Sequence, residues 1–187
     1  MGFTNWSIER VSQFRSCAII KRDSDRRFML KNERAIRICV GASAGGHMNQ
    51  LLKLLEMSRN WPKPPLFCVT TLEALAEKLA QLGPVYIIGE CNRRHLLKTL
   101  RVLMRSLKVV IKERPDVVIT TGSLPLAMVC LSAKLFGAKI VWIDSIANIE
   151  RLSLSGRMIR HLADLFLTQW PELAQQYPSV EYAGAIV

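Results

Sequence analysis

The sequence is short of acidic residues. It has 15 Asp and Glu against 26 Lys and Arg, which gives a formal net charge of +11 at pH 7 and an isoelectric point near 9.9. A surface with this charge favours an anionic partner, such as a phosphate group, an anionic lipid or a nucleic acid. Half of the 187 residues are apolar, so the composition is that of one globular domain and not of a disordered tail.

Paired cysteines are missing as well. No two cysteines are spaced as Cys-x-x-Cys, and the five are scattered along the chain: Cys17, Cys39, Cys68, Cys91 and Cys130. This pattern argues against a disulfide framework and against a zinc site, and it favours a reducing compartment in which these residues pack as small apolar side chains. We predict neither a metal nor a cofactor.

Long apolar runs are also lacking. Residues 1–34 are polar and basic, and their longest apolar run covers residues 17–20, so we predict a mobile basic extension and no signal peptide. Residues 117–133 carry no charge, but the polar turn 120–123 and Pro125 interrupt them. They fit a strand, a turn and a helix better than a membrane span, and we predict no transmembrane helix.

Apolar segments alternate with helical ones from residue 35 onward. The predicted strands cover residues 36–41, 66–70, 85–89, 116–121, 139–144 and 164–170, and the predicted helices cover 47–59, 72–82, 94–113, 125–136 and 155–163. The strands are apolar on both faces, which is typical of parallel strands covered by helices. Residues 35–187 are therefore predicted to form a single Rossmann-like, doubly wound α/β domain.

A glycine-rich turn, Gly41-Ala-Ser-Ala-Gly-Gly-His47, follows the first predicted strand. The lysine of a P-loop is absent, and so is the acidic residue of a dinucleotide site. The five residues from Gly41 match the nucleophile elbow of an α/β-hydrolase, so an esterase with Ser43, Asp144 and His161 is an alternative. The other interpretation is a loop at which backbone N–H groups approach a sugar acceptor or its phosphates.

Several motifs occur together in one order. They are Ser43-Ala-Gly-Gly-His47, Thr120-Thr-Gly-Ser123, Val141-Trp-Ile-Asp-Ser145 with its continuation to Gly156, Ala163-Asp-Leu-Phe-Leu-Thr-Gln-Trp-Pro-Glu-Leu173, and Tyr177 to Gly184. Over residues 35–187 this pattern closely resembles the membrane-anchor subunit of the UDP-N-acetylglucosamine transferase of asparagine-linked glycosylation. It also resembles that subunit's bacterial capsule and exopolysaccharide relatives, and we place the chain in the bacterial branch.

The resemblance implies half of an enzyme. Such subunits supply the acceptor-binding, N-terminal-like half of a GT-B glycosyltransferase, and a separate small subunit binds the nucleotide sugar. We therefore expect a hexosyltransferase subunit that is inactive without its partner. It would act on a polyprenyl-diphosphate-linked saccharide, with a UDP-sugar donor, as a peripheral protein on the cytoplasmic face of the inner membrane. A membrane scaffold without catalysis is a further alternative.

The same resemblance assigns roles to individual residues. The catalytic candidates are His47, as the base, and Asp144. The acceptor and its phosphates are assigned to Ser43, Gly45, Gly46, Thr121, Gly122, Ser123, Ser145, Asn148 and Arg151. The partner subunit is expected to contact Tyr182, Gly184, Ile186 and Val187. This chain has Ile146-Ala-Asn148 where the family usually has an aromatic residue and Ala-Arg, so the phosphate role of this loop depends on Arg151 as a substitute.

Residues 93–114 predict a basic amphipathic helix. They hold eight Lys and Arg against one acid, and leucines and other apolar residues recur at spacings of three and four. We expect the apolar stripe to pack on the sheet and the basic face to meet anionic lipid, through Arg94, Lys98, Arg101, Arg105 and Lys108. Aromatic residues are not interleaved with the charges, which argues against nucleic-acid binding.

Overall fold

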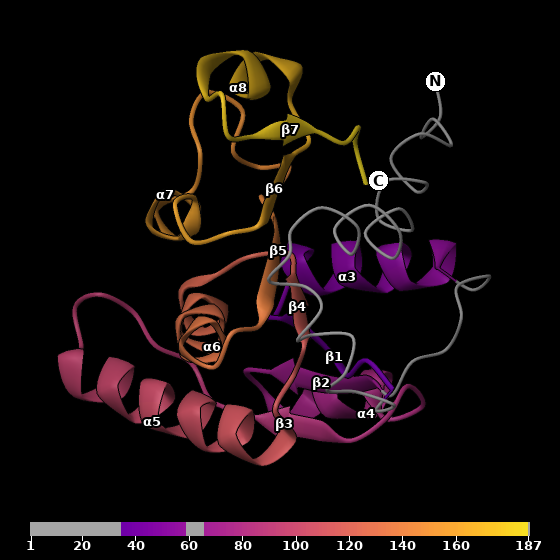
Figure 1. The fold of residues 1–187 in the computed structure, drawn as a ribbon, viewed down its shortest axis with the longest axis vertical. Coiled ribbons are helices and arrows are strands. Elements are labelled where there is room, and N and C mark those ends of the chain that lie inside the picture. The colour runs from indigo at the N-terminus through magenta and orange to yellow at the C-terminus, as the bar shows by residue number, and fades with distance from the viewer. Residues whose placement is uncertain (1–34, 59–65, 187) are drawn as a thin grey trace, which may run out of the picture. The chain divides into compact units, whose positions relative to one another are not determined.

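The structure is a computed structural model that describes residues 35–58 and 66–186 (Figure 1). By internal contacts the chain divides into two units, Met1–Ala35 and Ile36–Val187, and the sheet with its helices belongs to the second unit. The predicted mobile extension, residues 1–34, lies outside the described residues.

The described residues form one seven-stranded sheet in which every pair of neighbouring strands is parallel. The strands are β1 (Ile38–Ala42), β2 (Leu66–Thr70), β3 (Val85–Ile87), β4 (Val117–Thr120), β5 (Lys139–Ile143), β6 (Leu165–Thr168) and β7 (Glu181–Tyr182). Their order is β3-β2-β1-β4-β5-β6-β7. This arrangement confirms the predicted Rossmann-like fold, and the order reverses between β1 and β4, where such sheets bind ligands at the carboxyl ends of the strands.

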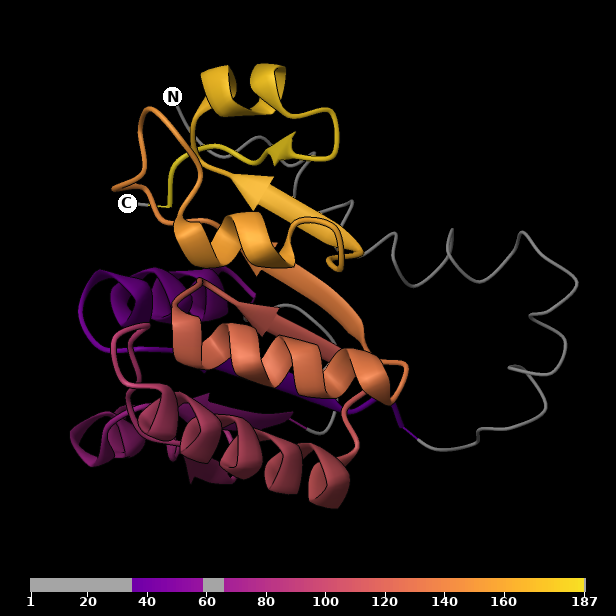
Figure 2. The same cartoon turned by 90° about the vertical axis from the view of Figure 1, so that its left-hand side faces the viewer.

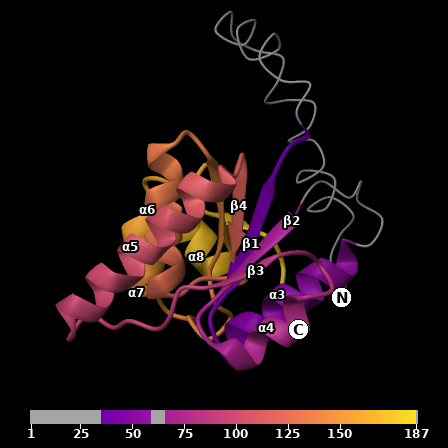
Figure 3. The ribbon, with the colours of Figure 1, turned by 90° about the horizontal axis from the view of Figure 1, so that it is seen from below.

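Helices cover both faces of the sheet. The short helix η2 (Glu73–Leu75), α3 (Gly46–Met57) and α4 (Ala76–Leu79) connect β1 to β2 and β2 to β3. The second layer holds α5 (Leu96–Glu113), α6 (Leu124–Leu135), α7 (Leu154–Ile159) and α8 (Pro171–Gln176). Figure 2 shows α5, α6 and α7 side by side, and Figure 3 shows α3 and α4 on the opposite side of the sheet from α5 and α6.

Three elements differ from the sequence prediction. Residues 72–82 form a 3-10 turn and one short helical turn in place of one longer helix, and of these two turns only Leu79 is buried. Helix α8 was not predicted, since six residues are too few to establish a helical period. The predicted strands end at residue 170, but Glu181 and Tyr182 form a further short strand that pairs with β6.

The main core lies between the sheet and helices α5 to α8. Trp142 and Phe166, from neighbouring strands, stack with ring centroids 6.4 Å apart. Their neighbours in this core include Ile140, Leu126 and Leu152, which are almost completely buried. Burial raises the pKa of the Cys68 and Cys130 thiols to about 12, so these two cysteines are packing residues, as predicted.

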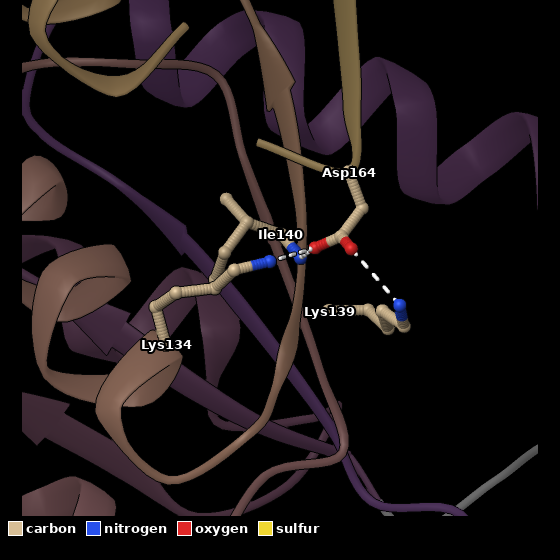
Figure 4. Close-up of polar contacts among 4 residues, drawn as sticks. All are labelled: Lys134, Lys139, Ile140 and Asp164. Carbon is tan, nitrogen blue, oxygen red and sulfur yellow. Dashed lines mark hydrogen bonds and ion pairs between the residues drawn. The ribbon is translucent and has the colours of Figure 1, made fainter. Parts of the chain in front are cut away.

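Polar contacts at the amino edge of the sheet join the starts of two strands (Figure 4). Asp164, just before β6, accepts hydrogen bonds from Lys134 Nζ at 2.6 Å, from the Ile140 backbone amide at 2.9 Å and from Lys139 Nζ at 3.0 Å. One carboxylate therefore fixes the end of α6 and the starts of β5 and β6, on the opposite edge of the sheet from the glycine-rich turns.

Candidate functional site

Two turns meet at the carboxyl ends of β1 and β4, where the strand order reverses. His47 lies in the first turn of α3, which follows β1, and Thr121 follows β4. The His47 Nδ1 lies 2.6 Å from the Thr121 carbonyl oxygen, and the Thr121 hydroxyl donates to the His47 carbonyl oxygen at 2.7 Å. Thr121 is completely buried. The two predicted motifs, 74 residues apart in sequence, are thus brought into direct reciprocal contact.

This contact fixes the proton on the imidazole ring. A carbonyl oxygen can only accept a hydrogen bond, so Nδ1 carries the proton toward Thr121. In the neutral ring Nε2 is then the unprotonated nitrogen, which is the form required of a general base. The His47 side chain is partly exposed, so solvent or a ligand can reach this region.

The turn after β4 is built around the ring of His47. A Cβ at Gly122 would lie 3.1 Å from His47 Cε1 and 3.5 Å from Trp142 Cζ2, and Gly122 has a φ of +111°. Ser123, which precedes α6, has a φ of +92°, a conformation that is strained for any residue other than glycine. Its hydroxyl is buried and has no hydrogen-bond partner among the described residues. Strain and an unsatisfied donor together are typical of a binding site.

The turn after β1 is open. An added Cβ at Gly45 or Gly46 would have no neighbouring atom within 4 Å, and both residues are exposed. Neither a side-chain cap nor an acidic residue occupies the first turn of α3, and the same is true of α6. Neither helix N-terminus is therefore neutralised by a side chain of its own, and the exposed one at α3 is available to an anion. Ser43 is partly exposed beside them.

Asp144 follows β5 and is 2% exposed. Its carboxylate accepts hydrogen bonds from the Ser153 amide at 2.8 Å, the Ser153 hydroxyl at 2.5 Å and the Trp142 indole at 3.3 Å. Because both oxygens are held by donors of its own loop and strand, Asp144 closes the loop of residues 145–153. This geometry favours a positioning role over the predicted catalytic one.

The loop 145–153, which follows β5, holds three further residues that were predicted to bind the acceptor. Ser145 and Asn148 are partly exposed, and the Asn148 amide donates to the Ser145 carbonyl oxygen at 3.1 Å. Arg151 is exposed and makes no ion pair with the described residues. The three residues share one loop at the carboxyl edge of the sheet, next to the turn that holds Thr121, because β5 pairs with β4.

Helix α5 differs from its predicted packing. Val102, Ser106 and Val110 are buried, and the helix packs against α6. However, a second set of apolar side chains is exposed, at 77% for Leu96, 84% for Leu97, 55% for Leu100 and 48% for Met104. The expectation that the whole apolar stripe packs on the sheet was wrong, because α6 covers only one part of it.

The predicted membrane-facing cations divide into two groups. Arg94, Lys98, Arg101 and Lys108 are exposed and form no ion pair among the described residues. Arg105 is exposed as well, but its Nη1 donates to the Ile88 carbonyl oxygen at 3.4 Å. That side chain is partly directed toward the end of β3, so it is a weaker candidate for contact with lipid.

The residues predicted to bind the partner differ in their exposure. Tyr182 is 50% exposed, and Gly184, with a φ of +82°, turns the chain. Ile186 is 4% exposed, and its amide donates to Gln169 Oε1 at 2.7 Å, so its side chain is not available to a partner in this conformation. Val187 lies outside the described residues.

The alternative hydrolase triad does not assemble. His161 follows α7, at the amino edge of the sheet just before β6, whereas Ser43 follows β1 at the carboxyl edge. The four residues of β6 alone span about 13 Å. In addition, Asp144 is bound to Ser153 and Trp142 instead of a histidine. The esterase prediction is therefore wrong.

Three polar residues of this edge were missed from the sequence. Ser153 binds Asp144, and Gln169 and Trp170, which follow β6, bind the backbone of the loop after β5. Their position directly after a strand is the signal that could have identified Gln169 and Trp170.

Neither a metal centre nor a membrane span occurs in the part of the chain that the structure describes. Within residues 35–58 and 66–186, no three His, Cys, Asp or Glu side chains lie close enough together to hold a metal ion. In the same ranges, no helix combines the length and apolar character needed to cross a bilayer.

A sequence comparison decides the family. A family model described as "Oligosaccharide biosynthesis protein Alg14 like" matches residues 85–186, which is more than half of the chain. The chain belongs to the Alg14 family. The matched residues include α5, the turn after β4, the loop after β5 and the tail. The family resemblance stated from the sequence motifs is therefore confirmed.

Curated relatives of this Alg14-family chain cover most of its length. The "UDP-N-acetylglucosamine transferase subunit ALG14" of Mus musculus is 29% identical over 182 residues, covering 82% of this chain and 84% of that protein. The protein of the same name from Schizosaccharomyces pombe is 40% identical over 77 residues, or 38% of this chain.

Solved structures share the fold. MurG of Acinetobacter baumannii matches with a TM-score of 0.64 and 15% identity, covering 80% of this chain and 45% of that chain. The UDP-N-acetylglucosamine 2-epimerase of Rickettsia bellii matches with a TM-score of 0.61 and 15% identity, covering 82% of this chain and 46% of that chain. This chain spans about half the length of these GT-B proteins, and the predicted equivalence to one GT-B half is confirmed at the level of fold.

Proposed function

We propose that this chain is the acceptor-binding and membrane-recruiting subunit of a two-component glycosyltransferase. The enzyme would transfer a hexosyl group from a UDP-sugar to a polyprenyl-diphosphate-linked saccharide. The observation that carries the proposal is the contact of His47 with Thr121 at the reversal of strand order, which leaves Nε2 as the unprotonated ring nitrogen. Family membership and the relatives' name as transferase subunits support the same conclusion.

The donor side of the reaction is assigned to a separate subunit. The chain supplies one Rossmann-like domain and spans 45% of the length of MurG. A second small Rossmann-like protein would bind the UDP-sugar and complete the cleft, with Tyr182 and Gly184 on the side that faces it. We expect the chain alone to be inactive, because the nucleotide-binding half of the cleft is assigned to the partner.

His47 is the proposed base. Its Nε2 would take the proton of the acceptor hydroxyl while the acceptor oxygen forms a bond to the anomeric carbon of the sugar. The bond from that carbon to the phosphate oxygen breaks, and UDP leaves with the bonding electrons. The hydrogen bond from Nδ1 to Thr121 would stabilise the imidazolium that forms.

The acceptor diphosphate would lie at the N-termini of α3 and α6, neither of which has a side-chain cap. Gly45 and Gly46 allow close approach to the start of α3, and Thr121, Gly122 and Ser123 lead into α6. Ser43 lies in the first of these turns. From the third loop, Ser145 and Asn148 can donate hydrogen bonds, and Arg151 is a cation that forms no ion pair within the described residues. Asp144 acts in the proposal as a positioning residue.

Membrane recruitment is assigned to α5. With about 100° per residue, the helix has three sectors in order around its axis. They are a buried one at Val102 and Val110, an exposed apolar one at Leu96, Leu97, Leu100 and Met104, and a basic one at Lys98, Arg101 and Lys108, while the exposed Arg94 lies just before the helix. An exposed apolar sector beside a basic one matches a helix that lies in the surface of an anionic bilayer.

The position of α5 supports this role. The helix begins at the carboxyl edge of the sheet, because it connects the end of β3 to the start of β4. Leu96 and Leu97 are therefore at the same edge as the glycine turns, and a bilayer beneath them would hold a lipid-linked acceptor near His47. We infer attachment to the cytoplasmic face of the membrane as a peripheral subunit. A role in capsule or exopolysaccharide synthesis rests on the sequence resemblance alone, and the relatives named above are eukaryotic.

Reconstitution tests the two-subunit proposal. The chain is co-expressed with a small Rossmann-like protein encoded in the same genome, and transfer from labelled UDP-sugars to polyprenyl-diphosphate acceptors is measured for the pair and for each chain. We expect a stable pair that transfers sugar and no transfer by either chain alone. Transfer by this chain alone would contradict the division of labour, and a stable pair that never transfers would favour the scaffold alternative.

Flotation with lipid vesicles tests α5. Replacing Leu97 with Ser should weaken binding to vesicles containing phosphatidylglycerol at least about fivefold, since a leucine side chain leaves the apolar phase. Leu135, the last residue of α6, is 82% exposed and provides the matched control. Leu135→Ser should leave vesicle binding unchanged. Equal effects of the two substitutions, or no effect of Leu97→Ser, would overturn the assignment.

A further inference from the structure

Two adjacent side chains after β6 hold the loop after β5. Gln169 is 3% exposed, and its Nε2 donates to the Asp144 carbonyl oxygen at 3.0 Å. Trp170 Nε1 donates to the Ile146 carbonyl oxygen at 2.7 Å. The loop 145–153 is therefore tied from outside by the next strand, in addition to the bonds that Asp144 makes within it.

Gln169 also holds the C-terminal segment. Its Oε1 accepts the hydrogen bond from the Ile186 amide at 2.7 Å. A carbonyl oxygen only accepts and a backbone amide only donates, so the amide orientation of Gln169 is fixed by its two partners. A side chain that donates at one end and accepts at the other is required here, and glutamine fits this requirement.

The bonds continue without a break into the loop. The Asp144 carboxylate accepts from the Ser153 amide at 2.8 Å, and the Ser153 hydroxyl accepts from the Gly156 amide, also at 2.8 Å, which lies in the first turn of α7. One connected set of bonds therefore runs from Ile186 through Gln169 and Asp144 to Ser153.

We propose that Gln169 is a positioning residue that couples the C-terminal segment 183–186 to the loop 145–153, so that a protein bound to the tail changes the order of the loop. The inference rests on the proposed function for the identity of that protein, the donor-binding subunit. Tyr182 and Ala185 are exposed and offer it a place to bind. Binding that draws Ile186 out of its buried position would break the bond to Gln169 and loosen the loop that carries Ser145, Asn148 and Arg151.

Amide hydrogen exchange in the full chain alone, followed by NMR, tests the coupling. Gln169→Met keeps most of the side-chain volume and removes both bonds, so exchange of the Ile186, Asn148 and Ser153 amides should accelerate at least about fivefold. Exchange of amides in β1 and β4 should stay unchanged. Gln175→Met, on the exposed surface of α8, is the matched control and should leave all of them as they are.

A second variant approaches the coupling from the tail. Ile186→Pro removes the donor N–H, and it should accelerate exchange at Asn148 and Ser153 although it lies outside the loop. Ile186→Ala keeps the N–H and should affect these two amides much less. If either Ile186→Pro or a folded Gln169→Met leaves Asn148 and Ser153 at the wild-type rate, the proposal is overturned. Should Gln169→Met fail to fold, Ile186→Pro decides alone.

Different experimental results would refute the coupling and the proposed function. The exchange experiment needs no partner and no sugar, so a negative transfer assay leaves it standing. In a reconstituted transferase, Gln169→Met should raise the acceptor KM severalfold while kcat changes little, a split that general destabilisation would not give. An unchanged KM together with faster loop exchange would overturn the assignment of the acceptor to this loop and retain the coupling.

Discussion

The two edges of the same sheet are built in opposite ways. At the amino edge, two carboxylates are held by neighbouring donors: Asp164 binds Lys134 and Lys139, and Glu113 binds Arg37 and the Tyr86 hydroxyl. At the carboxyl edge, the hydroxyls of Ser123 and Thr71 are buried without a partner among the described residues, and Gly45 and Gly46 border open space. Saturated contacts stabilise the fold, whereas unsatisfied ones remain for a ligand.

The ionisable side chains at the two edges also differ in burial and bonding. Glu113 is buried at the end of α5, so its charge requires the neighbours that it has. His47, in contrast, uses one ring nitrogen for the fold and leaves the other unbonded within the described residues. Substitutions of the paired carboxylates at the amino edge should therefore change stability without touching the chemistry, and those of the exposed or unbonded groups at the carboxyl edge should do the reverse.

The largest effect is expected at His47. In the reconstituted pair, His47→Asn should lower transfer at least about a hundredfold, because the base is lost. The asparagine amide can still donate to the Thr121 carbonyl oxygen, so the melting temperature of the chain should change little. Transfer within tenfold of wild type would contradict the role of base, and binding of the partner serves as the control.

At the amino edge, Asp164→Ala should lower the free energy of unfolding by about 2 kcal/mol, because three donors lose their common acceptor. Urea unfolding measures this change. Vesicle binding and pairing with the partner should stay at the wild-type level once the variant is folded. If stability is unaffected but transfer is lost, the contrast between the edges is wrong.

Two glycines at the carboxyl edge give a matched comparison, because Gly41 lies in β1 and Gly46 begins α3. A Cβ at Gly41 would lie 2.5 Å from Leu126 Cδ1 and 3.1 Å from the Val69 carbonyl oxygen, so Gly41→Ala should cost about 1–2 kcal/mol of stability. Gly46 has open space around it, and Gly46→Ala should leave stability nearly unchanged. If the acceptor approaches this backbone, however, Gly46→Ala should reduce transfer about tenfold. Thermal unfolding and the transfer assay together separate the two outcomes.

The smallest expected effect is the loss of stability at low pH when Asp164 becomes protonated. Burial alone would raise the pKa of Asp164, but hydrogen bonds from Lys134, the Ile140 amide and Lys139 outweigh it and hold that pKa below its usual 3.8. The carboxylate therefore contributes stability that is fully present above pH 3.8 and is lost as the pH falls through the lowered value. The stability difference between wild type and Asp164→Asn should shrink between pH 6 and pH 3. A constant difference would show that the charge contributes nothing.

The fold class was accessible from the sequence because parallel strands buried on both faces leave continuous apolar segments. The same segments show where each strand ends, and in a doubly wound sheet the functional groups follow those ends. This is why Ser43, His47 and Thr121 could be named before their contacts were known. The short helices escaped prediction, since α8 has too few residues to display a period.

The sequence by itself thus determined the α/β architecture, the glycine turns, the basic character of α5 and the family. Tertiary structure alone decided what each polar group does. Asp144 became a positioning residue because Ser153, nine positions later, returns to it, and Ile186 turned inward because Gln169 bonds its amide. The leucines of α5 stayed exposed because α6 covers one sector of the helix. Such outcomes depend on which neighbours arrive in space, and a linear pattern carries no record of them.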